Sequence, residues 1–259
     1  MHTKAPRRIP KTKQARSEHL VPGFSTHQID SRLPKTAQVY ELLRAAIISM
    51  KLPPATPIVE KEVCEMLGIS RTPLREAIIQ LATESLILVK PGGGTFINRI
   101  VLTEVLEGQI IRDTLEARLV RLAARHFTPF FASSFEVALF QQKGAADRKD
   151  MDEFFELDNK FHKLVCECSG FSSAWQTLHS ATGQLDRVRR YALPKAKHFR
   201  ENLQEHASIY QHIKDRNEDG AADAFQHHID RLFKEIDFIR ELDPELVSYD
   251  ADVSVLNIR

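Results

Sequence analysis

Four residues in the second half of the sequence have the types and spacing of a metal-binding set: Asp158, His162, His206 and His228. Asp158 and His162 are four residues apart, and four residues of α-helix return to within roughly 40° of the starting direction, so these side chains project together. An inward-facing carboxylate must be paired, hydrogen-bonded or metal-bound, because leaving it bare is costly. One oxygen and three imidazole nitrogens suit a divalent metal ion. Zinc fits this donor set best, and nickel, manganese and iron are compatible with it.

All four candidate ligands lie on apolar stripes of helical periodicity, so each is expected to point into a protein interior. A lone inward histidine is usually a satisfied core residue, whereas three on separate helices beside a carboxylate favour a shared site. The remaining histidines, including His179, His198 and His212, are expected to be surface or structural residues. The apolar partners on the stripes include Phe154, Phe161, Val165, Ile209, Ile213, Phe225, Ile229 and Leu232.

A series of helices must position these ligands. From Thr103 onward apolar residues recur at helical spacing, and no strand-like alternation interrupts them. We therefore expect an antiparallel all-α helical bundle over residues 102–241, followed by a C-terminal tail over residues 242–259. The individual helices are predicted at residues 103–126, 132–146, 151–168, 174–192, 195–215 and 220–242.

The region before residue 100 has a different pattern. Helical periodicity from Lys35 ends near Met50, where three prolines between residues 52 and 57 prevent its continuation. Two short helices follow, at residues 59–67 and 71–84, with the spacing of a helix-turn-helix.

The turn and the following segment complete this arrangement. Gly68 suits a left-handed C-terminal cap, and Ser70 is a suitable N-cap for the second helix. Residues 86–89 and 95–97 are predicted to be strands around a glycine-rich tip at residues 90–94. The sequence thus predicts a winged helix-turn-helix domain over residues 34–99 and, with the bundle, a mainly α protein.

The second helix of this domain has the composition of a DNA-recognition helix. Leu74, Ile78 and neighbouring apolar residues form its buried stripe, while Arg71, Thr72 and Arg75 point elsewhere. The two arginines are one turn apart at the N-terminal end, which is the end that enters a major groove. Guanidinium groups there can bind guanine edges or phosphates. An amphipathic helix with surface arginines is the plainer alternative, and the predicted wing favours DNA binding.

Composition limits the remaining possibilities. The 259 residues carry a net charge of +1, and no apolar run approaches the roughly 18 residues of a membrane helix. Three cysteines without a scaffold spacing suit a reducing, cytoplasmic compartment, and no secretory signal is expected. Residues 1–33 are rich in prolines and basic residues and are predicted to be a disordered arm. The arm is either a solvated tail or a segment that tracks phosphates.

The stretch EKEVCEMLGISRTPLREA, from Glu60 to Ala77, resembles the signature of the GntR family of regulators. Three positions depart from the family pattern, because Met50, Ala55 and Ser85 stand where glycine is usual. None of these departures removes a DNA-contacting group. The resemblance implies DNA contacts for Lys61, Ser70, Arg71, Arg75 and Gly92.

Residues 101–240 resemble the all-helical ligand-binding domain of the FadR subfamily, in its metal-binding variety. The opening signature corresponds to the stretch RDTLE from Arg112 to Glu116. The resemblance implies that Asp158, His162, His206 and His228 bind the metal. It also implies a cavity for the carboxylate of a small metabolite, with Arg112 as an effector-binding cation. Alternatively, Arg112 forms an ion pair with Glu116. Arg187 and Arg190 are expected on the surface.

Together these features predict a homodimeric repressor of the GntR type with no enzymatic activity. Two recognition helices would enter successive major grooves of a palindromic operator. A small organic acid bound at the metal would change the operator affinity, and no membrane partner is expected. The alternatives are a direct metal sensor, and a metallohydrolase whose DNA-binding domain is accessory.

Overall fold

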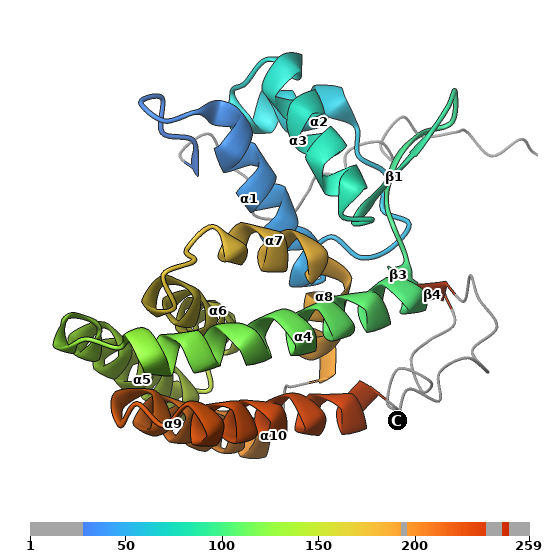
Figure 1. Cartoon of the computed structure of the whole chain (residues 1–259). Helices are drawn as coiled ribbons and strands as arrows, with labels where there is room; N and C mark the ends of the chain where they lie inside the picture. The colour runs from blue at the N-terminus through green and yellow to red at the C-terminus, as the bar shows by residue number, and fades with distance from the viewer. Residues whose placement is uncertain (1–27, 193–195, 237–244, 249–259) are drawn as a thin grey trace, which may run out of the picture.

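The computed structural model describes residues 28–192, 196–236 and 245–248, which form a smaller N-terminal domain above a larger helical domain (Figure 1). Most of the predicted basic arm and most of the predicted C-terminal tail lie outside these residues. No helix among the described residues is long and apolar enough to cross a membrane. The predicted fold class, a winged helix-turn-helix domain followed by a helical bundle, is confirmed.

The N-terminal domain contains three helices and an antiparallel hairpin. α2 ends at Gly68, whose φ of 64° is the left-handed cap that the sequence predicts. In the hairpin, Ile87 pairs with Ile97 and Lys90 pairs with Gly94. The elements are α1 (Lys35–Ile48), α2 (Glu60–Leu67), α3 (Arg71–Thr83), β1 (Ile87–Lys90) and β2 (Gly94–Ile97).

The three departures from glycine keep the backbone conformation that glycine favours. Met50, Ala55 and Ser85 have φ values of 58°, 64° and 55°, all in the left-handed region. A residue with a side chain pays about 1–2 kcal/mol to adopt this conformation. The turns of the N-terminal domain are therefore preserved at a local cost in backbone strain.

The helical domain follows the predicted order with one difference. The single helix predicted at residues 174–192 is interrupted at Thr182, which gives the two shorter helices α7 and α8. The elements are α4 (Leu102–His126), α5 (Pro129–Arg148), α6 (Met151–Cys168), α7 (Ala174–Ala181), α8 (Gly183–Ala192), α9 (Ala196–Lys214) and α10 (Glu218–Ile236).

A short parallel pairing joins the domain junction to a segment near the C-terminus. β3 (Ile100–Val101) pairs with β4 (Val247–Ser248), and Val247 is buried against the junction. The sequence predicts no element in this segment. Two residues are too few to show strand alternation, so the strand depends on its partner rather than on a local pattern.

The helix α8 lies between the N-terminal domain and the rest of the bundle (Figure 1). Its first residue, Gly183, packs so closely that an added Cβ would lie 3.2 Å from Glu84 Oε2. The expected surface location of Arg187 is wrong, because this side chain is fully buried and its Nη1 donates to the carbonyl of Asn98 at 2.9 Å. Arg189 is also buried, on the side facing the bundle. The prediction assumed that only one face of this helix is buried, whereas the winged domain covers one face of α8 and the bundle covers the other.

Candidate metal centre and nucleic-acid interface

The structure brings the four predicted metal ligands together in the middle of the helical domain. Each of the three histidines offers one ring nitrogen to a group whose members all lie within 4.8 Å of one another, and all three residues are buried. They come from α6, α9 and α10. Asp158 Oδ1 lies 3.5 Å from His206 Nε2, and its Oδ2 lies 3.8 Å from His162 Nε2.

Side-chain oxygens outside this cluster fix the orientation of each imidazole ring. His162 Nδ1 lies 2.5 Å from Glu116 Oε2, and His228 Nδ1 lies 2.7 Å from Glu205 Oε2. An ionised carboxylate can only accept hydrogen bonds, so both rings donate from Nδ1. In a neutral ring this leaves the lone pair on Nε2, which is the arrangement found around metal-binding histidines.

The third ring, His206, is oriented by a chain of amides that begins at Asp158. Asp158 Oδ1 accepts from Asn202 Nδ2 at 3.0 Å, and Asn202 Oδ1 accepts from Gln142 Nε2 at 3.2 Å. Gln142 Oε1 is then left to accept from His206 Nδ1 at 3.0 Å. His206 Nε2 consequently carries a lone pair, and it is buried with no hydrogen-bond partner in the described part of the chain.

The electrostatics give the cluster the protonation states that a metal ion requires. Burial lowers the pKa of His206 and of His228 well below the usual range, so both rings are neutral at neutral pH. Burial would raise the pKa of Asp158, but the positive charges around it, that of Arg189 foremost, together outweigh burial and hold that pKa well below its usual value. A charged carboxylate beside neutral imidazoles fits a divalent cation of the zinc type.

Arg112 forms the ion pair with Glu116 that was one of its two predicted roles, and it also lies at the candidate metal centre. Its Nε donates to Glu116 Oε1 at 2.7 Å, which is the i,i+4 ion pair. Its Nη2 also contacts His162 Nε2 at the candidate metal centre. Burial would raise the pKa of Glu116, but His162 and Arg112 lower it to about 2. Glu116 thus connects the arginine to the ring that it orients.

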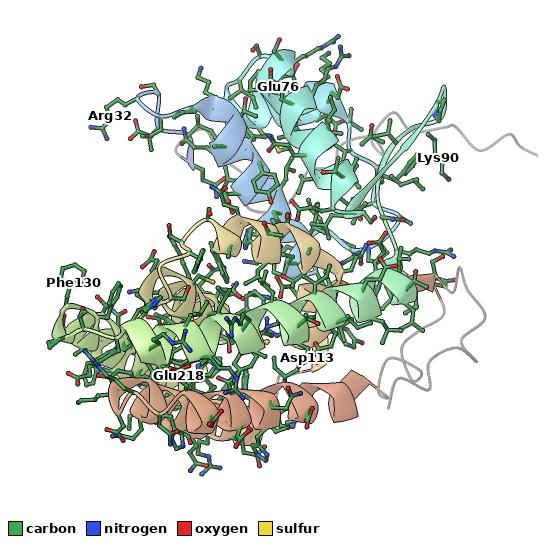
Figure 2. All side chains as sticks on the ribbon, in the orientation of Figure 1. Arg32, Glu76, Lys90, Asp113, Phe130 and Glu218 are labelled. Carbon is green, nitrogen blue, oxygen red and sulfur yellow. The ribbon has the colours of Figure 1, made fainter. Side chains whose placement is uncertain are left out.

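Several functional side chains are not predicted from the sequence. Glutamine, asparagine and glutamate residues on a helix rarely signal a role by type alone, and only Glu116 lies in a motif that the sequence analysis singled out. On α4, both side-chain amide atoms of Gln109 and the Oδ1 of Asp113 are buried without hydrogen-bond partners among the described residues. Asp113 lies on the side of α4 that faces α10 (Figure 2). Gln109 lies three residues before Arg112, and Asp113 lies three residues before Glu116, so these side chains share one side of α4.

The predicted DNA contacts lie on the N-terminal domain. Arg71, Thr72 and Arg75 are exposed on the first half of α3, and Arg75 Nε donates to Glu60 Oε2 at 3.0 Å. Glu76 of the same helix lies on the side of the domain remote from the bundle (Figure 2). Ser70 occupies the N-cap position without a side-chain capping hydrogen bond, so its exposed hydroxyl is not used by the helix.

Lys61 and the hairpin tip complete this surface. Lys61 is exposed on α2, and its Nζ lies 3.9 Å from Glu65. Gly92 is exposed at the tip with a φ of 67°, a conformation that suits glycine. Lys90 projects from the hairpin beside the tip (Figure 2). Its Nζ lies over the ring of Phe96, 5.3 Å from the centroid. Its type and position make it a further phosphate-binding candidate that sequence reasoning missed.

A winged helix-turn-helix with exposed basic side chains, joined to a separate helical domain with a buried polar centre, defines a DNA-binding regulator of two domains. Residues 35–97 match the model of the bacterial regulatory proteins of the gntR family, and residues 109–231 match the FCD domain. The chain belongs to the GntR family of bacterial transcription regulators, with the FadR-like architecture of a GntR domain followed by an FCD domain.

Relatives agree with this assignment. The HTH-type transcriptional repressor RspR of Escherichia coli is 33% identical over 214 residues, which are 83% of this chain and 94% of RspR. The galactonate operon transcriptional repressor of Escherichia coli is 27% identical, over 74% of this chain and 92% of that repressor. The structure of Escherichia coli McbR/YncC shares the fold, with a TM-score of 0.70, 20% identity, and coverage of 79% of this chain and 99% of that one. The relatives are transcription regulators and not enzymes, which disfavours the metallohydrolase alternative.

Proposed function

We propose that this chain is a homodimeric repressor whose operator affinity is controlled by a small carboxylate metabolite bound at a divalent metal, with zinc as the first candidate. Asp158, His162, His206 and His228 would hold the metal. The observation that carries the proposal is the common orientation of the three imidazoles, each of which uses Nδ1 for an outer oxygen and leaves Nε2 toward the centre.

The lining of the centre supports a carboxylate as the effector. A bound metal ion would supply Lewis acidity and coordination positions for carboxylate oxygens. Arg112 adds a buried positive charge at His162, and its Nη1 has no hydrogen-bond partner among the described residues. Buried polar atoms without partners are uncommon in folded proteins and mark places where a ligand can bind. Gln109 and Asp113 would bind further polar groups of the metabolite.

DNA binding would use the winged domains of both protomers of a dimer. A two-fold symmetric dimer presents two α3 helices to successive major grooves, and this arrangement matches a palindromic operator. Arg71 and Arg75 would contact base edges or phosphates, with Lys61, Ser70, Thr72 and the tip at Gly92 around them. Effector and operator affinities must then be coupled reciprocally, because both ligands bind one chain.

The experiment compares effector response in matched histidine variants. Metal content is determined first, and small carboxylates are screened by thermal shift on the metal-loaded wild-type protein. Operator binding is then measured by fluorescence anisotropy, with and without the best carboxylate. His206→Ala should lose the response, and its operator affinity without the carboxylate should stay near that of the metal-free wild-type protein. The control is His227→Ala, an exposed neighbour of His228 that should respond like wild type.

Two outcomes would revise the proposal. If His206→Ala remains folded but no longer binds the operator, the site is required for DNA binding itself and the assumed coupling is wrong. If metal alone changes operator affinity reversibly and no carboxylate adds to the effect, the chain is a direct metal sensor. Four protein ligands suffice for a complete tetrahedral set, which is the observation that favours this second candidate.

A further inference from the structure

The helix α8 carries charged side chains toward both domains. Arg189 points to the candidate metal centre, where its Nη2 donates to Asp158 Oδ2. Asp186, one turn earlier, accepts from Arg189 Nη1 at 3.0 Å through its Oδ1. The other oxygen of Asp186 lies 3.5 Å from Nη2 of Arg44, which belongs to α1 of the winged domain.

The series of ion pairs continues inside the winged domain. Arg44 Nε donates to Glu84 Oε2 at 2.9 Å, at the C-terminal end of the recognition helix α3. An uninterrupted chain of alternating charges therefore runs from the metal centre to the end of the helix that would read DNA. Its members are Asp158, Arg189, Asp186, Arg44 and Glu84.

Burial makes these pairs sensitive to one another. All five residues are less than a tenth exposed. In a low-dielectric interior, hydrogen-bonded charges interact more strongly than in water, and loss of one partner leaves the other uncompensated. Arg189 is shared between two carboxylates, and Asp186 is shared between two arginines. A change at either end of the chain therefore alters how strongly Arg189 and Asp186 interact with each of their two partners.

A cation at Asp158 competes directly with Arg189 for the same carboxylate. Once that carboxylate is taken, Arg189 has Asp186 as its remaining partner in the chain. A stronger pair between these two weakens the contact of Asp186 with Arg44, which is already the longest in the series at 3.5 Å. The effect of the cation is thus transmitted to the contact between the two domains.

We propose that Arg189 and Asp186 are positioning residues through which occupation of Asp158 by a cation changes the docking of the winged domain. This inference rests on the proposed function, because it requires that the centre binds a metal. Two further hydrogen bonds cross the interface between the winged domain and the helical domain. Gln184 Nε2 donates to the carbonyl of Ser85 at 2.6 Å, and Arg44 Nη2 donates to the carbonyl of His179 at 2.5 Å. A shift of α8 would therefore move the base of the wing as well as α1.

The test measures how Zn²⁺ changes affinity for a DNA duplex that the wild-type protein selects from random sequence. In wild type the Kd should change by about 5–150-fold on adding Zn²⁺, the usual range of coupling between sites. Asp186→Asn is nearly isosteric, so this variant should still bind Zn²⁺. Adding Zn²⁺ should change its Kd for DNA by less than about twofold, compared with about 5–150-fold in wild type. The control is Lys51→Gln, which removes the exposed interdomain pair with Asp152 and should keep the wild-type ratio.

A second measurement separates transmission from structural damage. Calorimetric titration should show that Arg189→Gln binds Zn²⁺ more tightly than wild type, because the competing cation is gone, whereas a merely structural role predicts weaker binding. Thermal unfolding of Asp186→Asn, Arg44→Gln and the double variant, without metal, should show a combined loss smaller than the sum of the single losses. This cycle tests the chain of pairs even where a variant binds no metal.

The results discriminate between the two proposals. If wild type binds neither Zn²⁺ nor another divalent metal ion, the proposed function fails, and the unfolding cycle alone decides whether the ion pairs act together. If wild type binds Zn²⁺ and responds to it while Asp186→Asn responds equally, the metal site stands and the transmission through α8 is overturned. Zn²⁺ binding without any change in wild-type DNA affinity, or additive losses in the unfolding cycle, would also overturn the transmission.

Discussion

The two domains use charged side chains in opposite ways. On the winged domain, the side chains of Lys61 and Arg75 are 74% and 60% exposed, and each forms an ion pair with a glutamate of α2. In the helical domain, the side chains of Arg112 and Arg189 are 3% and 4% exposed, and each is held by a carboxylate. The exposed set is available to an external polyanion. The buried set is compensated internally, so it responds to whatever alters one of its members.

The largest expected effect is on the exposed set. Arg71→Ala should weaken operator binding by about 1–3 kcal/mol, or roughly 5–150-fold, because a guanidinium that binds a base edge cannot be replaced by alanine. Circular dichroism should be unchanged, since Arg71 is exposed at the start of α3. Fluorescence anisotropy with the operator duplex measures the effect. Arg118→Ala removes the same charge from an exposed position on α4 and should bind normally. Equal losses in both variants would indicate a general charge effect.

A smaller effect is expected in the buried set, at the residue that orients His162. Glu116→Gln should lower metal affinity by about 10–100-fold, the usual consequence of removing an outer hydrogen-bond partner of a metal-binding histidine. Glutamine keeps the shape of the side chain but loses the charge that pairs with Arg112. Titration against a competing chelator measures the affinity. Glu107→Gln changes an exposed glutamate on the same helix and should have no effect. Unchanged affinity in Glu116→Gln would mean that the glutamate serves only the ion pair.

The same contrast explains what the sequence could predict. The candidate DNA contacts from Lys61 to Arg75 lie in a contiguous motif, and the candidate metal ligands Asp158 and His206 lie on regular apolar stripes. Local patterns therefore suffice to nominate both sets. The outer partners Gln142 and Asn202 depend on which helices face each other, and sequence spacing does not report this. The role of Arg189 could not be predicted for a related reason. Periodicity predicts one buried face of α8, and it cannot show that a second domain covers the opposite face.

The interface between the domains predicts a pH dependence of stability. Burial, and then the charge of Arg44, lower the pKa of His179 to about 4. The unfolded chain, with a histidine pKa near 6.5, therefore binds more protons between pH 6.5 and 4, and stability falls as the pH drops through that window. The contribution of His179 is up to about 1.4 kcal/mol per pH unit.

Urea unfolding at several pH values measures this slope. The free energy of unfolding of His179→Gln should fall less steeply with decreasing pH than that of wild type, because glutamine takes up no proton. Other buried histidines titrate in both proteins and cancel in the difference. His227→Gln, at an exposed histidine, should match wild type. Parallel slopes for wild type and His179→Gln would show that the interface already accommodates a charged His179.

The smallest expected effect is a gain in stability from the backbone of the winged domain. Ala55 is exposed with a φ of 64°, and its N–H donates to the carbonyl of Ile97 at 2.9 Å, so the turn cannot relax without losing that bond. Ala55→Gly removes about 1–2 kcal/mol of strain and adds about 0.5–1 kcal/mol of unfolded-state entropy. The net gain should be about 0.5–1 kcal/mol by urea unfolding.

A matched alanine gives the opposite sign. Ala45 is exposed within α1, where glycine lacks helical propensity, so Ala45→Gly should destabilise the protein by about 1 kcal/mol. A loss in both variants would mean that the strain at Ala55 is already relieved elsewhere in the turn. Opposite signs would show that this turn of the winged domain bears a local backbone cost. Charge variants in the helical domain test the interaction energy of buried ion pairs instead, and this energy is shared among side chains from several helices.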